Sequence, residues 1–224
     1  MLDIVKNLDW SILTNVLLSV IPALLCITLH ELSHGYVAYL LGDRTAKQMG
    51  RLTLNPIRHI DIMGLIIMVL FHFGWAKPVP VDMRNFKNPK QGMALTALAG
   101  PISNILITII ALFLYGFFYL PMSQSEVGMY GLNMLYITAH ISVALAVFNL
   151  IPIPPLDGSK VLFSLASNRT YYKLMRYERY GMILIAAVLL LGFLDSALQT
   201  AINFILNGFW GIADFAFQLS THIF

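Results

Sequence analysis

Long apolar blocks restrict this chain to folds that lie in a membrane. They cover about residues 10–41, 91–120, 131–151 and 180–206. Each block reaches or exceeds the roughly 20 residues that an α-helix needs to cross the hydrocarbon core of a bilayer. The hydrophobic share of 58% and the charged share of 11% also lie far from those of soluble proteins. We therefore expect an all-α polytopic membrane protein with about four transmembrane helices.

The last block is less uniform than the others. Its strongly apolar part ends near Leu194, and Asp195, Gln199 and Asn203 then give the continuation an amphipathic pattern. Such a pattern also suits a helix that lies at the membrane interface. A fourth span and an interfacial helix after Leu194 therefore both stay open.

The chain is expected to form one domain, because the sequence has no internal repeat and no low-complexity linker. This membrane-embedded domain covers residues 1–224, with its core at residues 10–160 and C-terminal membrane segments at residues 180–224.

Basic residues cluster in two stretches that flank the apolar blocks. Of the 14 Lys and Arg residues, all but Lys6 lie in residues 44–90 or 160–179. The positive-inside rule places both stretches in the cytoplasm, so we expect the N-terminus and the loop at residues 121–130 on the outer side. Basic residues beside membrane spans explain the net charge of +3 without a nucleic-acid partner.

The first block carries polar residues that a simple membrane span does not need. His30 and His34 are four residues apart, so on a helix their imidazoles share one face and can bind one metal ion, with Glu31 beside them. In zinc hydrolases with this H-E-x-x-H spacing, the neutral histidines are ligands and the glutamate takes a proton from a water that the metal activates. An inert polar network is the alternative, but three such groups inside a membrane need a compensating partner. We therefore predict Zn²⁺ as the cofactor.

A catalytic zinc site usually has three protein ligands and one open position. Four residues are candidates for the third ligand: Asp157, His140, His72 and Asp195. His140 is nine residues before Asn149, or about 13 Å along the same helix. This position is nearer the outer face than that of the two histidines in the first block, so depth disfavours His140.

The prolines that follow the third block favour Asp157. Residues 148–160 read FNLIPIPPLDGSK, and the prolines at positions 152, 154 and 155 forbid a regular helix there. Irregular backbone at membrane depth is tolerated where protein or a cavity satisfies it, which is typical of a site. Asp157 can thus fold back toward His30 and His34. The alternative is a turn that only ends the helix, with Asp157 as a cap.

Three motifs, in this order, resemble those of a known family. They look like the motif set of the site-two protease family, whose members are membrane-embedded zinc metalloproteases. The three motifs are HELSH at residues 30–34, AGPISN at 99–104 and NLIPIPPLDG at 149–158. Two further stretches are similar to the compact prokaryotic members, which lack PDZ and CBS domains: GRLTLNPIRHID at 50–61 and GWAKPVPV at 74–81. The small residues of AGPISN also permit close helix approach.

The resemblance implies an intramembrane zinc endopeptidase in a prokaryotic cell membrane. It assigns the zinc ligands to three residues: His30, His34 and Asp157. It makes Glu31 the general base, and it makes Asn149 and Asn104 polar groups that hold the substrate backbone or its developing oxyanion. The implied substrates are single-pass membrane proteins, cut within or beside their transmembrane segments in regulated intramembrane proteolysis.

A shorter apolar block at residues 62–75 has only 14 residues, too few to cross a membrane as a helix, so a re-entrant segment fits it better. The sequence AKPVPVD at residues 76–82 alternates proline and valine, which favours extended backbone. Members of the resembled family place β-structure near the active site, and an exposed strand edge there could pair with an unwound substrate. An amphipathic surface loop is the alternative.

Two other classes of function stay open. A divalent-metal transporter could use His30, His34 and Asp157 for transit, with access from both faces of the membrane. A non-catalytic membrane partner protein could keep the same fold, although the intact Glu31 argues against it.

Overall fold

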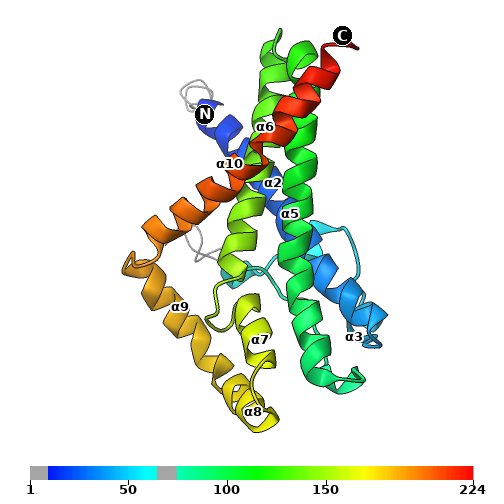
Figure 1. Ribbon diagram of the computed structural model, residues 1–224, viewed down its shortest axis with the longest axis vertical. Helices are drawn as coiled ribbons and strands as arrows, with labels where there is room; N and C mark the ends of the chain where they lie inside the picture. Colours follow the sequence, from blue (N-terminus) through cyan, green and yellow to red (C-terminus); the bar gives the residue numbers. More distant parts are fainter. Residues whose placement is uncertain (1–9, 65–74, 224) are drawn as a thin grey trace, which may run out of the picture.

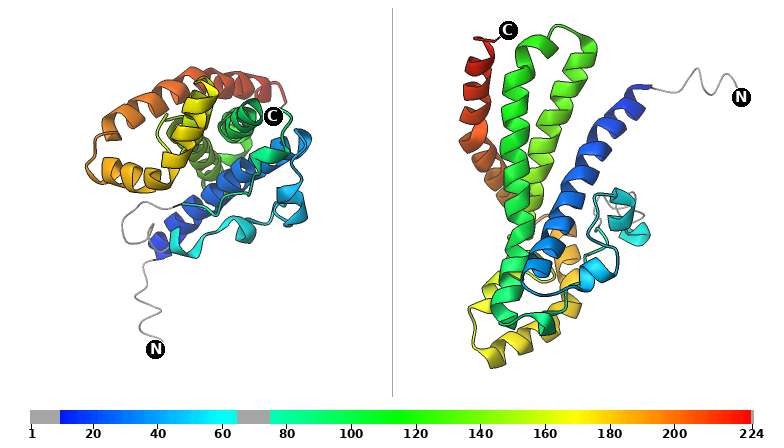
Figure 2. Two further views of the ribbon diagram at one scale, coloured as in Figure 1. Left: turned by 90° about the horizontal axis from the view of Figure 1, so that it is seen from below. Right: turned by 90° about the vertical axis from the view of Figure 1, so that its right-hand side faces the viewer.

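The computed structural model describes residues 10–64 and 75–223 of the protein (Figure 1). Three of the helices described are long and apolar enough to cross a membrane. They are α2 (Trp10–Leu40), α5 (Pro89–Met122) and α6 (Glu126–Asn149). These helices confirm the first three predicted spans, and they pack against one another at the centre of the molecule (Figure 2). The protein is therefore an all-α, multi-pass membrane protein.

The predicted fourth span does not form a single helix. Residues 180–206 are divided between α9 (Gly181–Leu190) and α10 (Asp195–Ser220). Gly192, with a φ of 70°, lies in the left-handed region that glycine adopts where helices end. The 10 residues of α9 extend over about 15 Å, which is half the thickness of the hydrocarbon core. The described residues thus contain three helices of spanning length and composition instead of four.

A buried apolar cluster joins α5, α6 and α10. Its members are Ala111, Leu112, Ala139, Val143, Ile202, Leu206 and Ala213. Gly116 allows α5 and α10 to meet, because a Cβ at this position would lie 2.0 Å from the carbonyl oxygen of Ala213. Small residues permit such close approach of helices in a membrane. Packing therefore makes α10 part of the helix bundle, although its sequence is only moderately apolar.

The connections between the helices gather toward two ends of the bundle. The short helices α3 (Thr45–Gln48), α7 (Asp157–Ser164) and α8 (Asn168–Tyr177) lie toward one end, and η3 (Glu178–Tyr180) joins α8 to α9. The C-terminus and the turn between α5 and α6 lie at the other end (Figures 1 and 2). Helix α3, the start of α5 and helix α8, which carry basic residues of both stretches, therefore lie toward the same end of the molecule.

The described part of the connection from α2 to α5 includes α3 and two 3₁₀ helices, η1 (Pro56–His59) and η2 (Met83–Asn85). One antiparallel bridge pairs Ile60 with Ala76, and the amide of Lys77 donates a hydrogen bond of 2.9 Å to the carbonyl of His59. The predicted β-structure is limited to this isolated bridge in the part of the chain that the structure describes. Most of the predicted re-entrant block, residues 65–74, lies outside the described residues.

Candidate metal centre

Two histidines and one aspartate converge inside the helix bundle. His30 and His34 lie one turn apart on α2, and Asp157 is the first residue of α7. The Nε2 atoms of the two histidines are 3.0 Å apart, and Oδ2 of Asp157 lies 3.3 Å from that of His30 and 3.0 Å from that of His34. All three residues are buried, with exposed fractions of 6%, 9% and 7%.

The donor atoms and their spacing fit a zinc ion. Two imidazole nitrogens and a carboxylate oxygen are typical ligands of catalytic zinc. Bonds of about 2.0–2.1 Å in a tetrahedral arrangement separate neighbouring ligand atoms by about 3.3 Å. The separations of 3.0 to 3.3 Å between His30, His34 and Asp157 come close to this value. The three side chains could therefore hold zinc with little rearrangement.

Asp157 reaches the histidines because α6 ends where the prolines begin. The helix stops at Asn149, irregular backbone follows over residues 150–156, and α7 starts at Asp157. Gly158 packs against the end of α6, since a Cβ there would lie 2.2 Å from the carbonyl oxygen of Leu150. The Nζ of Lys160 lies 3.6 Å from Oδ1 of Asp157, so this cation faces the carboxylate oxygen that points away from the histidines. Gly158 thus leaves room for the chain to turn back after the prolines, so that Asp157 lies beside the two histidines.

Helix α5 covers the two imidazole rings. The Nδ1 atom of His34 lies 2.7 Å from the carbonyl oxygen of Thr96, and Nδ1 of His30 lies 3.1 Å from Nδ2 of Asn104. A Cβ at Gly100 would lie 2.5 Å from Cε1 of both rings, so only glycine fits between these contacts. The segment AGPISN therefore packs directly on the rings that carry the candidate ligand atoms.

Glu31 lies beside the three candidate ligands, and its carboxylate has a hydrogen-bond partner outside that group. The amide of Val79 donates a hydrogen bond of 2.8 Å to Oε2 of Glu31. Val79 lies in residues 76–82, which we call the strap, between Pro78 and Pro80, which have no amide hydrogen to donate. Gly35 makes room for the strap against α2, because a Cβ there would lie 2.8 Å from Cγ1 of Val79.

The buried carboxylate of Asp43 anchors the strap to the end of α2. Its oxygens accept hydrogen bonds from the amide of Asp82 at 2.7 Å, from Nδ2 of Asn85 at 2.8 Å and from the amide of Thr45 at 3.0 Å. Burial alone would raise the pKa of Asp43, but these hydrogen bonds hold it below its usual range. A second contact, from Nη2 of Arg51 to the carbonyl of Lys77 at 2.8 Å, holds the other end of the strap.

Of the remaining predicted site residues, Asn104 contacts this cluster, whereas Asn149 bonds within its own helix. Nδ2 of Asn149 donates to the carbonyl of Leu145 in its own helix, at 2.9 Å. Asn104 is fully buried and faces His30. In the part of the chain that is described, the three-residue metal-ligating group includes neither His140 nor Asp195. The fourth candidate for the third ligand, His72, lies outside the described residues.

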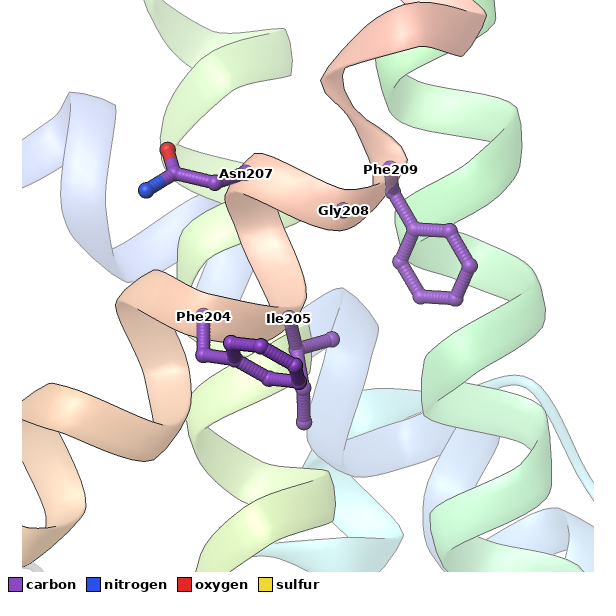
Figure 3. Close-up of a pocket in the computed structure, with 5 residues that line it drawn as sticks. All are labelled: Phe204, Ile205, Asn207, Gly208 and Phe209. Carbon is purple, nitrogen blue, oxygen red and sulfur yellow. The ribbon is translucent and has the colours of Figure 1, made fainter.

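A separate cavity of about 390 Å³ lies along α10. It is lined by Phe204, Ile205, Asn207, Gly208 and Phe209 (Figure 3). All five residues belong to α10, and none of them is a predicted ligand or catalytic residue. This cavity is therefore distinct from the metal centre.

Sequence reasoning missed the backbone contacts of the centre. The carbonyl of Thr96 and the amide of Val79 touch His34 and Glu31, but any residue type supplies a carbonyl and any residue except proline supplies an amide. The anchoring role of Asp43 was also missed. Its position just after Gly42, which has a φ of 108° at the end of α2, is the one local signal that could have drawn attention to it.

Comparisons with known proteins agree with this chemistry. Residues 120–193 match the model of Peptidase family M50. This matched region contains Asn149 and Asp157, whereas His30 and His34 precede it. No solved structure is a significant match for the chain.

Three relatives illustrate the range of similarity. YwhC of Bacillus subtilis (strain 168), assigned as a zinc metalloprotease, is 41% identical over 175 residues, which cover 73% of this chain and 76% of YwhC. Rip2 of Mycolicibacterium smegmatis, with the same assignment, is 28% identical over 75% of this chain and 64% of its own length. The zinc metalloprotease MJ0392 of Methanocaldococcus jannaschii is 28% identical over 65% of this chain, but only 33% of that protein is covered.

Proposed function

The chain belongs to peptidase family M50, the site-two protease family, and we propose that it is a zinc endopeptidase that cuts membrane proteins within or next to their transmembrane segments. The observation that carries this proposal is the cluster of His30, His34 and Asp157, buried where α2 and α5 pack and where α7 begins. A cluster inside the bundle favours substrates that are themselves in the membrane. Regulated intramembrane proteolysis is the process in which such cleavage would act.

Zinc held by these three ligands would act as a Lewis acid toward the scissile carbonyl and lower the pKa of a water molecule. Glu31 is the general base, and the hydrogen bond from Val79 to its Oε2 fixes the orientation of the carboxylate. We assign Oε1 as the atom that receives the proton from water and then delivers it to the leaving amine. The chain thus supplies both the ligands and a fixed proton carrier.

Asn149 is the residue we assign to the substrate backbone. It is half-buried at the end of α6, directly before the turn that leads to Asp157. One of its amide hydrogens is used by the carbonyl of Leu145, so the second and the amide oxygen can serve a peptide group. A substrate role for Asn104 stays a prediction, and its contacts favour the other role described below.

We place the centre within the membrane, nearer the cytoplasmic face. His30 is 10 residues before Leu40, the last residue of α2, which corresponds to about 15 Å. The basic residues toward this end of the bundle favour the cytoplasm, and the N-terminus is then outside. The relatives from two bacteria and one archaeon support a prokaryotic cell membrane.

The test is cleavage of a single-pass membrane protein by the purified protein in proteoliposomes. We expect Glu31→Gln to abolish cleavage while zinc content stays at the wild-type level, because Glu31 is not one of the three ligands. The matched control is Glu126→Gln, an exposed glutamate at the start of α6, which should cleave normally. Cleavage at the wild-type rate by Glu31→Gln would refute the mechanism, and zinc flux without cleavage in the wild type would favour a transporter instead.

A further inference from the structure

We propose that Asn104 is a positioning residue that accepts a hydrogen bond from Nδ1 of His30 and thereby leaves Nε2 of His30 free to bind the metal. This inference rests on the proposed zinc site and assigns Asn104 a role behind the ligand instead of at the substrate. A neutral imidazole carries one proton, and a ring that binds metal through Nε2 must carry it on Nδ1. Metal-binding histidines therefore commonly donate this proton to a fixed acceptor.

The two histidines differ in the kind of partner that lies behind them. Nδ1 of His34 lies 2.7 Å from the carbonyl oxygen of Thr96, which can only accept, so His34 must donate from Nδ1. Nδ1 of His30 lies 3.1 Å from the side-chain amide of Asn104, which has both a donor and an acceptor end. Only His30 therefore depends on a side chain for its tautomer.

The orientation of the Asn104 amide decides which tautomer His30 adopts. With Nδ2 toward the ring, the amide donates to Nδ1, and the proton of His30 is then on Nε2, where it blocks a metal. In this orientation the buried oxygen Oδ1 has no hydrogen-bond partner among the described residues. Turning the amide of Asn104 by 180° places its oxygen Oδ1 at Nδ1 of His30 as an acceptor. The hydrogen bonds open to the amide oxygen and nitrogen decide which of the two orientations is adopted. A metal on Nε2 requires the ring proton on Nδ1, and the exchanged orientation gives that proton an acceptor, so this orientation is favoured when a metal binds.

The surroundings of Asn104 hold it at this position. The residue is 0% exposed, so its amide cannot reach a substrate through solvent-accessible space. Its backbone carbonyl accepts hydrogen bonds from Oγ of Ser142 at 2.8 Å and from Oγ1 of Thr108 at 3.0 Å. The bond from Ser142 joins α6 to α5 at the level of Asn104, the bond from Thr108 lies within α5, and the side chain is left to face His30.

The test compares Asn104→Leu with Asn104→Asp in the full-length protein. Leucine has nearly the same size but accepts no hydrogen bond, so the affinity for zinc, measured by competition with a chelator, should fall about 10- to 100-fold. Aspartate keeps an oxygen acceptor, so Asn104→Asp should bind zinc within a few-fold of the wild type. Asn149→Leu is the matched control and should keep the wild-type affinity. The absorption spectrum of the Co²⁺-loaded protein should change in Asn104→Leu and stay close to the wild type in Asn104→Asp.

The alternatives give different results. If Asn104 contacts the substrate, Asn104→Leu binds zinc normally and shows a raised KM or a lowered kcat, which would overturn the inference. If Asn104 only fills space, Asn104→Asp, with its buried charge, loses zinc while Asn104→Leu keeps it, which would also overturn it. A wild-type protein that binds no zinc would refute the zinc site itself, so that failure is distinguishable from failure of the role of Asn104.

Discussion

Gly100 is the residue at which the packing of α5 on the metal centre is tightest. A Cβ there would lie 2.5 Å from Cε1 of both His30 and His34, and neither ring can move without displacing Nε2. Overpacking of this kind costs about 1–3 kcal/mol. We therefore expect Gly100→Ala to lower zinc affinity roughly tenfold or more, measured by chelator competition.

The control for this substitution is Gly208→Ala. Gly208 lies inside α10, and no neighbouring atom of the described residues comes within 4 Å of the place that a Cβ would take, so alanine should leave zinc affinity unchanged. Normal zinc binding by Gly100→Ala would show that α5 can move away from the rings, contrary to the tight packing at Gly100.

The third ligand can be tested at Asp157 and His140. Asp157 lies within 3.3 Å of both histidine Nε2 atoms, whereas His140 packs against Tyr136 with ring centroids 6.5 Å apart. We expect Asp157→Ala to lose most of its zinc and its cleavage activity, and His140→Ala to keep both. Metal analysis of the two purified variants measures this, and the reverse pattern would remove Asp157 from the site.

Among the connecting segments, the strap has the most direct effect on the centre, because its position sets the hydrogen bond from Val79 to Glu31. Asp43 holds the strap through the amide of Asp82 and is itself fully buried. Asp43→Ala removes a charged acceptor, which typically lowers the free energy of unfolding by about 2–3 kcal/mol. We expect cleavage and the melting temperature to fall while zinc is retained, since no ligand lies on the strap.

Arg84→Ala supplies a control in the same segment. Arg84 pairs with the side chain of Asp82 at 2.6 Å, but its own side chain is 86% exposed, and such surface pairs contribute little. Its cleavage rate and melting temperature should match the wild type. Loss of zinc from Asp43→Ala would show instead that Asp43 supports the metal site as a whole.

At the scale of the whole molecule, the arrangement of the helices makes a prediction about topology. Lys47 in α3 and Lys173 in α8 lie toward one end of the bundle, and Ser125 lies in the turn between α5 and α6 at the other (Figure 1). All three side chains are exposed. We expect cysteines at positions 47 and 173 to be labelled only from the cytoplasmic side, and a cysteine at 125 only from the outer side.

The labelling experiment uses a Cys26→Ala background, because Cys26 is the single cysteine of the chain. A membrane-impermeant maleimide applied to intact and to opened cells distinguishes the two sides. Labelling of positions 47 and 173 from opposite sides would contradict the three-helix arrangement around the metal centre.

Local patterns in the sequence were sufficient for the main helices and for the candidate ligands. The first three spans follow from the length of the apolar blocks, since a helix is the simplest way to satisfy the backbone in a membrane. The spacing of His30 and His34 follows from the helical period, and the prolines before Asp157 require a break in α6. The break near Leu194 also shows in the sequence, where an amphipathic pattern begins, but hydropathy gives no sign of the packing that makes α10 part of the bundle.

The contacts around the centre were decided only by the tertiary structure. Asn104 and His30 are 74 positions apart, Val79 and Glu31 are 48 apart, and Asp82 and Asp43 are 39 apart. Apolar periodicity and residue chemistry act over a few neighbouring positions, so they identify helices and ligand types within a segment. Which side chain or amide meets a given ligand depends on how separate helices pack, and one sequence carries no local record of that. The sequence by itself therefore determined the spans and the candidate ligands, whereas packing of α5 and the strap on α2 decided how those ligands and Glu31 are held.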